Sequence, residues 1–286
     1  MSRELRPIQL IERSINKKYR KVLWNPFIEA VKKYELIKEN DKIAVCISGG
    51  KDSMLLAVLM RMLQRYSEVP FELVYLVMDP GYNAPNLERI KRNAELLELP
   101  VTIFHTDIFE AADNAGRYPC YLCAKMRRGH LYSAAKKLGC NKIALGHHFS
   151  DVIETTVMAM FYGSQLQGMM PKLHSTNYEG MELIRPLYCI HEDSIISWKN
   201  YNKLEFLQCA CRFTENNAHS SDGIGDSKRQ EIKVLIRQLK KTNPNIEKSI
   251  FNSLHAVHLD TFINYKTKGV YHSFLDNYDE TNGSDE

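Results

Sequence analysis

Residues 43–53 read Ile-Ala-Val-Cys-Ile-Ser-Gly-Gly-Lys-Asp-Ser, and this stretch decides the fold. Its first five residues form a continuous apolar run, which is typical of a strand buried on both faces of a parallel sheet. The paired glycines Gly49 and Gly50 follow at once, and an apolar pattern with helical spacing begins at Met54. A strand, a glycine turn and a helix start in this order predict a turn whose backbone N–H groups bind phosphate.

The same alternation of strand and helix continues along the chain. Apolar runs recur at residues 71–78, 101–105 and 142–146, with helical patterns between them, and a weaker fifth run lies at 182–184. This order predicts an α/β fold with a doubly wound, parallel, five-stranded sheet. Ligands of such sheets bind at the carboxyl ends of the strands.

Helical patterns flank the sheet region on both sides. They cover residues 7–23, a second helix from Asn25, and residues 193–201, 228–241 and 245–258. We therefore expect four segments along the chain. These are an N-terminal helical extension (1–38), a nucleotide-binding domain (39–190), a C-terminal helical region with the late cysteines (191–273) and a disordered acidic tail (274–286).

Composition narrows the class of protein. Hydrophobic residues make up 44% and charged residues 25% of the 286 residues, which is ordinary for a globular protein and excludes wholesale disorder. Because the chain has neither a membrane-length apolar run nor the apolar core of a signal peptide, we expect a cytoplasmic protein without a membrane partner. The net charge of the whole chain is +4. Residues 276–286 hold five carboxylates and no Lys or Arg, so the rest of the chain has a net charge of +9, which favours a polyanionic partner.

The glycine turn differs from a kinase loop. A Walker loop ends in Gly-Lys-Ser/Thr, whereas Asp52 follows Lys51 here. Residues 48–53 instead resemble the SGGxDS signature of the PP-loop, or N-type, ATP pyrophosphatases. The resemblance implies cleavage of ATP between its α and β phosphates and adenylation of a carbonyl oxygen. We expect Ser48, Lys51 and Ser53 to hold the departing pyrophosphate, together with the backbone of the two glycines, and Asp52 to position Mg²⁺.

The strand that follows the phosphate loop ends beside it in a parallel sheet. The main-chain atoms of Ala44 and Met78 are therefore expected to contact the adenine of ATP. A plain surface turn at residues 78–82 is the alternative interpretation.

Seven cysteines form an odd set with two tight pairs, which suits metal or redox chemistry better than a disulfide framework. Cys120 and Cys123 stand at a predicted helix start, and the late pair is Cys209 and Cys211. Thiolates serve both zinc and iron–sulfur clusters, so the spacing leaves both open. The single cysteines at 46, 140 and 189 are expected to be small core residues.

The chain as a whole resembles the tRNA 2-thiocytidine synthetases, a PP-loop family. The resemblance spans residues 7–258, and its motifs lie at residues 46–53, 120–123, 127–129, 145–148, 161–163, 170–173 and 184–187 and at the late cysteines. It implies a [4Fe-4S] cluster held by Cys120, Cys123 and Cys209, with one iron open to carry sulfide. The late pair is CxC here and CxxC in the family, so Cys211 is the alternative third ligand.

The GHHxxD motif of the family appears at residues 146–151, with Phe149 and Ser150 in place of the usual Arg and Asp. Gly146 and Asp151 are expected to contact the nucleotide or its magnesium ion. His147 and His148 belong to the same motif, and capping of the sheet is an equally weighted alternative role for them.

Residues 114–150 carry seven Lys or Arg and no Asp or Glu, and they include the first cysteine pair. A basic field at the predicted cluster favours RNA binding there, with Lys125, Arg127 and Arg128 as the contacts. Arg127 is also a candidate catalytic residue, together with Lys51, Asp52 and Asp151. Basic residues at 17–21 and 228–241 form two further patches, for which a solvated helix face is the plainer interpretation.

These observations lead to one main functional hypothesis, ATP-dependent 2-thiolation of a tRNA cytidine, at position 32 as in the family, with release of AMP and pyrophosphate. The resemblance implies a sulfide or persulfide donor and pairing as a homodimer. Thiolation of a tRNA uridine, lysidine-type ligation without sulfur, and a non-catalytic zinc or nucleotide-containing RNA-binding module are the alternatives.

Overall fold

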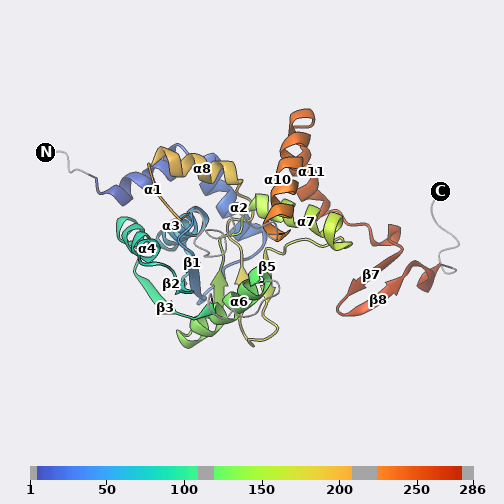
Figure 1. The fold of residues 1–286 in the computed structure, drawn as a ribbon, viewed down its shortest axis with the longest axis horizontal. Helices are drawn as coiled ribbons and strands as arrows, with labels where there is room; N and C mark the ends of the chain where they lie inside the picture. Colours follow the sequence, from blue (N-terminus) through green and yellow to red (C-terminus); the bar gives the residue numbers. More distant parts are fainter. Residues whose placement is uncertain (1–4, 109–118, 208–223, 279–286) are drawn as a thin grey trace. The chain divides into compact units, whose positions relative to one another are not determined.

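The computed structural model describes residues 5–108, 119–207 and 224–278, and the course of the chain is drawn in Figure 1. The chain divides into two compact units, residues 1–235 and residues 236–286. The four-segment division expected from the sequence stays a prediction. Within the described residues, no helix is long and apolar enough to cross a membrane.

The first unit is built on a six-stranded sheet with the order β3-β2-β1-β4-β6-β5. Its five parallel strands are those predicted: β1 (Lys42–Ile47), β2 (Glu72–Asp79), β3 (Val101–His105), β4 (Lys142–Ala144) and β6 (Glu182–Ile184). The sixth strand, β5 (Lys172–His174), pairs antiparallel with β6 at the edge and was not predicted, because three residues after a proline carry no strand signal. The α/β prediction is confirmed.

Strand order fixes where a ligand binds. The chain adds β2 and β3 on one side of β1 and then returns to place β4 on the other side. The direction of winding therefore reverses between β1 and β4, and the crevice outside their carboxyl ends is the usual ligand site of such sheets. Residues 48–53 follow β1 and Gly146 follows β4, so both sequence motifs lie at this crevice.

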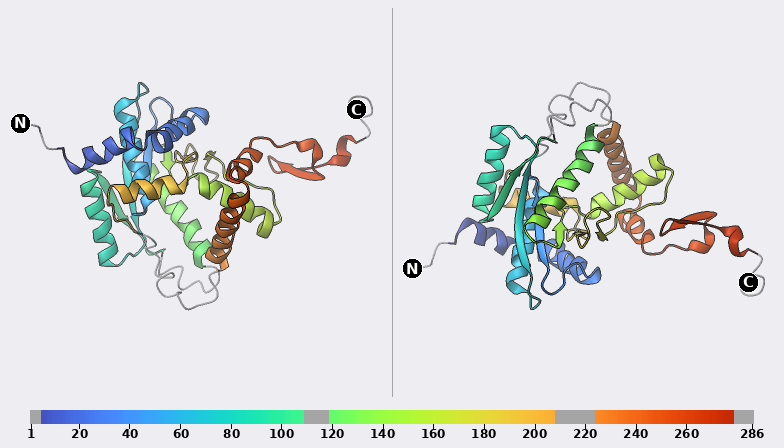
Figure 2. Two further views of the ribbon diagram at one scale, coloured as in Figure 1. Left: turned by 90° about the horizontal axis from the view of Figure 1, so that it is seen from above. Right: turned by 90° about the horizontal axis from the view of Figure 1, so that it is seen from below.

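Both faces of the sheet are covered, as the apolar run in β1 predicts. Ile43, Val45 and Ile47 belong to one buried cluster, and the alternate residues Ala44 and Cys46 belong to a second. The first cluster packs against α1 (Pro7–Lys17), α3 (Lys51–Tyr66), α4 (Ala84–Leu96) and α8 (Glu192–Tyr201). The second packs against α6 (Pro119–Lys137), and Figure 2 shows α4 and α6 on opposite sides of the sheet.

Helices α2 (Asn25–Lys33) and α7 (Phe149–Gly163) and the first part of α10 (Ile224–Thr242) also belong to the first unit. A π-helical turn, Arg20–Trp24, joins α1 to α2, so the predicted continuous helix over residues 7–23 is divided. Helix α7 follows β4, and His148 caps it by accepting a hydrogen bond from the N–H of Asp151. This histidine therefore caps a helix that starts at the crevice.

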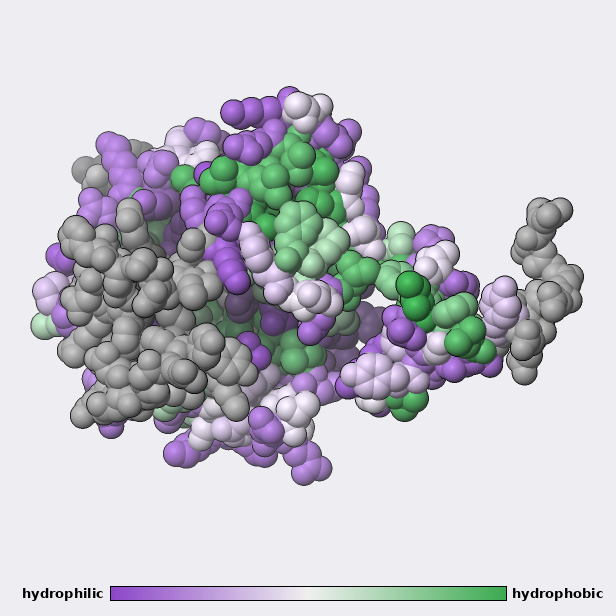
Figure 3. Space-filling model, turned by 45° about the vertical axis from the view of Figure 1, so that its right-hand side comes forward, coloured by the Kyte–Doolittle hydropathy of each residue, from purple (hydrophilic) through white to green (hydrophobic). Residues whose placement is uncertain are grey.

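The second unit contains the end of α10 (Ile224–Thr242), then α11 (Ile246–Ser253) and a hairpin of β7 (Asn264–Thr267) and β8 (Val270–Ser273). The hairpin was not expected, since residues 191–273 were predicted to be helical. Figure 3 shows hydrophobic residues among polar ones on this hairpin. A short 3₁₀ turn, Phe274–Asn277, begins the predicted tail, and residues 279–286 lie outside the described residues.

Candidate active site

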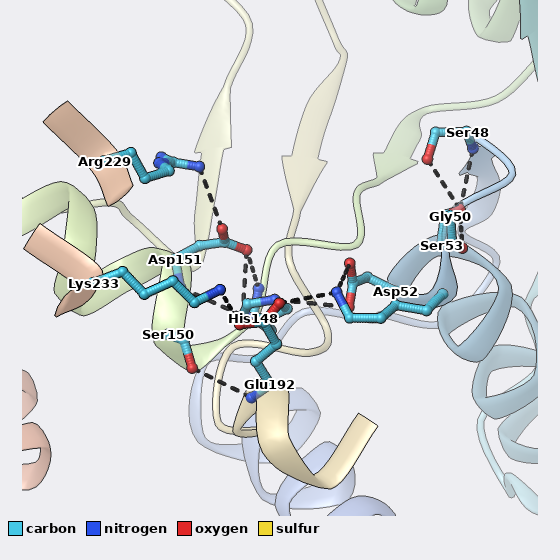
Figure 4. A network of polar contacts seen from close by, with 11 residues as sticks. Ser48, Gly50, Asp52, Ser53, His148, Ser150, Asp151, Glu192, Arg229 and Lys233 are labelled. Atoms are coloured by element: carbon cyan, nitrogen blue, oxygen red, sulfur yellow. Dashed lines mark hydrogen bonds and ion pairs between the residues drawn. The ribbon is translucent and has the colours of Figure 1, made fainter. Parts of the chain in front are cut away.

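The phosphate loop is a closed ring of hydrogen bonds at the start of α3. The N–H of Ser48 donates to Oγ of Ser53 at 3.1 Å, and this hydroxyl donates to the carbonyl of Gly50 at 3.0 Å (Figure 4). Gly49 has φ +83°, and a Cβ there would lie 2.6 Å from Cγ1 of Ile90. The loop therefore needs glycine at 49 both for its backbone angle and for space. Its position at a helix N-terminus makes it an anion site.

Gly146 brings the end of β4 against this loop. A Cβ at Gly146 would lie 3.1 Å from the backbone nitrogen of Ser53 and 3.2 Å from the carbonyl carbon of Asp52. Because both neighbours are backbone atoms, no side-chain rotation could make room. The predicted contact of Gly146 with the nucleotide stays a prediction, but its closeness to the loop is a feature of the fold.

A polar cavity of about 320 Å³ opens beside the loop. It is lined by residues from α3, α7, α8 and α10 and by the residue that caps α7. These are Lys51, Asp52, His148, Asp151, Glu154, Glu192, Arg229, Gln230 and Lys233. Lys51, Asp52 and Asp151 were predicted to act together, and the structure places all three on this one cavity. Tertiary structure alone adds the residues of α8 and α10.

Glu192 is the centre of the charge network in this cavity. Lys51 Nζ donates to Glu192 at 3.0 Å and to Asp52 at 3.1 Å, and Lys233 also donates to Glu192 (Figure 4). Burial raises the pKa of Glu192, but the hydrogen bond from Lys233 and the charge of Lys51 outweigh it and lower the pKa to about 2. Burial lowers the pKa of Lys51, and the carboxylates of Asp52 and Glu192 produce a net increase.

A second group of contacts surrounds Asp151. Its Oδ2 accepts the N–H of His148 at 3.0 Å, and Nη1 of Arg229 lies 3.5 Å from its Oδ1. Oδ1 of Asp52 is buried, and within the described residues it has no hydrogen-bond partner, with Nε2 of His148 3.7 Å away. Burial and the charge of Arg185 lower the pKa of the neighbouring His147 to about 4, so this imidazole is neutral at pH 7.

The two residues predicted to contact adenine belong to the same buried cluster. Met78 lies near the carboxyl end of β2. Ala44 is fully buried within β1, where it pairs with β2 and β4. Their contact with adenine stays a prediction.

The turn after β2 joins α6 to the phosphate loop. Oδ1 of Asp79 accepts the N–H groups of Gly81 and Tyr82 at 2.9 and 2.7 Å, which fixes the turn. The hydroxyl of Tyr82 accepts a hydrogen bond from Arg127 of α6 at 3.3 Å and donates to the carbonyl of Ser48 at 3.4 Å. The half-buried Arg127 is therefore connected to the loop, whereas Arg128 is exposed.

The side chains of the predicted cluster ligands lie outside the described residues. Cys120 and Cys123 belong to the first turns of α6, about two turns and one turn before Arg127, but their side chains and that of Lys125 lie outside the described residues. Cys209 and Cys211 also lie outside them. Of the single cysteines, 46 and 140 are buried as predicted, and 189 is half-buried.

The segment before the late cysteines touches the phosphate loop. The N–H of Leu207 donates to the carbonyl of Gly49 at 3.0 Å, and Leu207 forms an isolated parallel bridge with Gly50. Leu207 is two residues from Cys209 in the sequence. Sequence reasoning missed both Leu207 and Glu192, and it assigned Arg229 and Lys233 only to a basic patch, because these contacts join residues far apart in the chain.

The strand, glycine loop and helix of this site define a PP-loop nucleotide-binding protein, and the family model of the PP-loop domain matches residues 12–212. Two tRNA-cytidine(32) 2-sulfurtransferases are similar in sequence. The protein from Geobacter sulfurreducens is 34% identical over 85% of this chain and 91% of its own length. The protein from Neisseria meningitidis is 35% identical over 85% and 74%. The chain therefore belongs to the family of tRNA-cytidine(32) 2-sulfurtransferases, which are enzymes.

A solved structure shows the same fold. It is the U34-tRNA thiolase NcsA from Methanococcus maripaludis with its [4Fe-4S] cluster, which matches with a TM-score of 0.63 over 92% of this chain and 88% of the other, at 20% sequence identity. This likeness concerns the arrangement of helices and strands.

Proposed function

We propose that this enzyme uses ATP to replace the C2 oxygen of a tRNA cytidine, at position 32 as in its relatives, with sulfur. One observation carries the proposal: the helix that bears Cys120 and Cys123 and the described residue two positions before Cys209 are both tied to the phosphate loop. Arg127 of α6 is linked to Ser48 through Tyr82, and Leu207 bonds to Gly49. Activated phosphate and sulfur chemistry would therefore meet at the same crevice.

The loop residues serve the first chemical step. The C2 oxygen of the base attacks the α-phosphorus of ATP, the bond to the bridging oxygen breaks, and pyrophosphate leaves. Ser48, Lys51 and the N–H groups at the start of α3 would hold this leaving group and stabilise its negative charge. Attack of sulfide at C2 then expels AMP, so the oxygen leaves with the phosphate.

Magnesium fits the carboxylates of the cavity. The buried Oδ1 of Asp52 lacks a hydrogen bond within the described residues, and Asp151 lies on the same cavity. Carboxylate oxygens are the ligands that Mg²⁺ prefers, and it is usually held by one or two of them together with substrate phosphates. We therefore assign Asp52 and Asp151 to the metal that neutralises the developing charge, although no group of three ligands is preformed among the described residues.

The cysteines suit an iron–sulfur cluster. Three thiolates, from Cys120, Cys123 and Cys209 with Cys211 as the alternative, are the donor set that a [4Fe-4S] cluster needs when one iron stays open. When bound, the cluster would supply the sulfur. Its delivery to this enzyme requires a sulfide or persulfide donor.

The tRNA is held on the basic side of α6. Arg127 and Arg128, with Lys125, would contact the RNA backbone, and Arg127 would also approach the reacting nucleotide. A loop cytidine can leave its stack to reach the crevice, whereas a paired base would first have to be unpaired. We place the enzyme in the cytoplasm with its tRNA substrate, and its homodimeric state is part of the proposal.

Nucleoside mass spectrometry of tRNA from cells with and without the gene tests the substrate. We expect 2-thiocytidine to disappear on deletion. Unchanged 2-thiocytidine with loss of 2-thiouridine would move the assignment to a uridine.

Two variants separate the two halves of the chemistry. Cys120→Ser should abolish thiolation and retain ATP binding. Asp52→Ala should stop AMP formation and retain the iron–sulfur cluster, which is seen as the brown colour of the purified protein. Cys189→Ser is the matched control, because this half-buried thiol lies outside the proposed ligand set. Equal activity of Cys120→Ser and Cys189→Ser would refute the role of the cluster.

A further inference from the structure

Two basic side chains of α10 reach the cavity beside the phosphate loop. Figure 4 shows Arg229 and Lys233 entering from one side and Asp52, Ser48 and Ser53 standing on the other. The Lys233 side chain is 26% exposed and that of Arg229 is 43% exposed, so each cation is partly withdrawn from solvent. The sequence alone assigned both to a solvated helix face.

The carboxylates of the cavity hold these cations in place. Glu192 accepts hydrogen bonds from Lys51 and from Lys233, so one carboxylate brings together an ammonium group of the phosphate loop and one of α10. Arg229 lies against Asp151, the carboxylate assigned to magnesium. Cations of α10 and cations of the loop are thus arranged around one polar space of about 320 Å³.

The charge balance of the cavity suits a magnesium-bound polyphosphate. Three cations, Lys51, Arg229 and Lys233, face four carboxylates, which are Asp52, Asp151, Glu154 and Glu192. A bare polyanion would be repelled by this surplus of carboxylates. Mg²⁺ on Asp52 and Asp151 would reverse the surplus and leave the Lys and Arg donors to phosphate oxygens.

We propose that Arg229 and Lys233 bind the β and γ phosphates of ATP, so that the polyphosphate lies between the phosphate loop and α10. The inference rests on the proposed function in taking ATP as the nucleotide. Partly exposed ion pairs contribute little to stability, so a purely structural role of these two residues would leave nucleotide affinity nearly unchanged.

Equilibrium binding of ATP, pyrophosphate and AMP to the purified full-length enzyme with Mg²⁺ and without tRNA tests this proposal. Lys233→Gln and Arg229→Gln should each weaken ATP and pyrophosphate binding about tenfold, the usual effect of losing one charge-assisted hydrogen bond. AMP, which lacks the β and γ phosphates, should bind within about twofold of its wild-type affinity. Lys233→Arg keeps the charge and should bind ATP nearly as the wild type does.

Lys228→Gln is the matched control, since Lys228 is on the same helix but lies over the ring of Tyr162, 4.9 Å from its centre. Wild-type ATP affinity in both Gln variants would overturn the proposal, and so would an equal loss for ATP and AMP. Failure of the wild-type enzyme to bind ATP at all would instead refute the proposed function. Thermal unfolding of each variant shows that the fold is retained, and Arg229→Gln is an independent test should Lys233→Gln unfold.

Discussion

Glycine 49 shows how a single residue combines local and distant requirements. Its φ of +83° follows from the tight turn between β1 and α3, and a glycine pair in the sequence already signals such a turn. The lack of space at this position has a different origin. A Cβ at residue 49 would lie 2.6 Å from Cγ1 of Ile90 and 2.9 Å from Cδ1 of Leu207. Those residues belong to α4 and to the segment before the late cysteines, so only the folded chain reveals them.

Substitution of the two loop glycines should therefore have unequal effects. Gly49→Ala should reduce the free energy of unfolding by about 2–5 kcal/mol, through left-handed backbone strain of about 1–2 kcal/mol and overpacking of about 1–3 kcal/mol. Gly50→Ala should cost less than about 1 kcal/mol, because the φ of Gly50 is −79° and the nearest atom to its Cβ position is 3.6 Å away. Urea unfolding measures both, and equal losses would contradict this interpretation.

Glu192 is the opposite case, a residue without any local signal. It stands at the start of α8 and is 141 residues from Lys51, its partner at 3.0 Å. An acidic residue in a first helical turn has an ordinary explanation in the helix dipole. The low pKa of about 2 results instead from Lys51 and Lys233, which the fold brings to it.

At the scale of elements, segments with a clear apolar run or helical period were predicted well, and three short strands without one were missed. The apolar runs of β1, β2 and β3 and the helical patterns of α8 and α10 match the structure closely. β5 and the β7–β8 hairpin were missed because their three or four residues form no apolar run, unlike those of β4 and β6. None of the missed elements contributes to the cavity, so the predicted site did not depend on them.

The connection between α6 and the phosphate loop provides a prediction at this scale. Tyr82→Phe removes the hydroxyl that bridges Arg127 and Ser48. We expect the rate constant for tRNA thiolation to fall about fivefold, as for one hydrogen bond of about 1 kcal/mol, while KM for ATP stays within about twofold. Steady-state kinetics measure both. Tyr66→Phe is the control, since Tyr66 is 66% exposed on α3, and equal kinetics in the two variants would rule out the bridge.

At the scale of the whole molecule, the distribution of charge along the chain matters more for RNA binding than the net charge does. The chain carries +4, yet residues 279–286 hold four carboxylates and no basic residue, so the remainder carries +8. Long-range attraction of a polyanion such as tRNA depends on this field and is screened by salt. The acidic end should therefore weaken RNA binding at low ionic strength.

Truncation after Tyr278 tests this electrostatic role. We expect tRNA to bind about threefold more tightly at low salt, and the difference should disappear at high salt because screening removes it. Filter binding over a salt series measures the effect. A full-length chain with Asn and Gln in place of the four tail carboxylates should behave as the truncated chain does. Wild-type affinity in that neutral variant would show that charge is not the cause.

The sequence by itself determined the parallel α/β sheet, the phosphate loop after β1 and the membership of Lys51, Asp52 and Asp151 in one site. The sheet and the loop follow from periodicity and turn chemistry, which act over short distances in the chain. Asp151 was assigned to the same site through the family resemblance, since it is 99 residues from Asp52 in the sequence. Only the tertiary structure decided that Glu192, Arg229 and Lys233 complete the cavity and that Leu207 bonds to the phosphate loop. Such contacts depend on how separate elements pack, which no local pattern records.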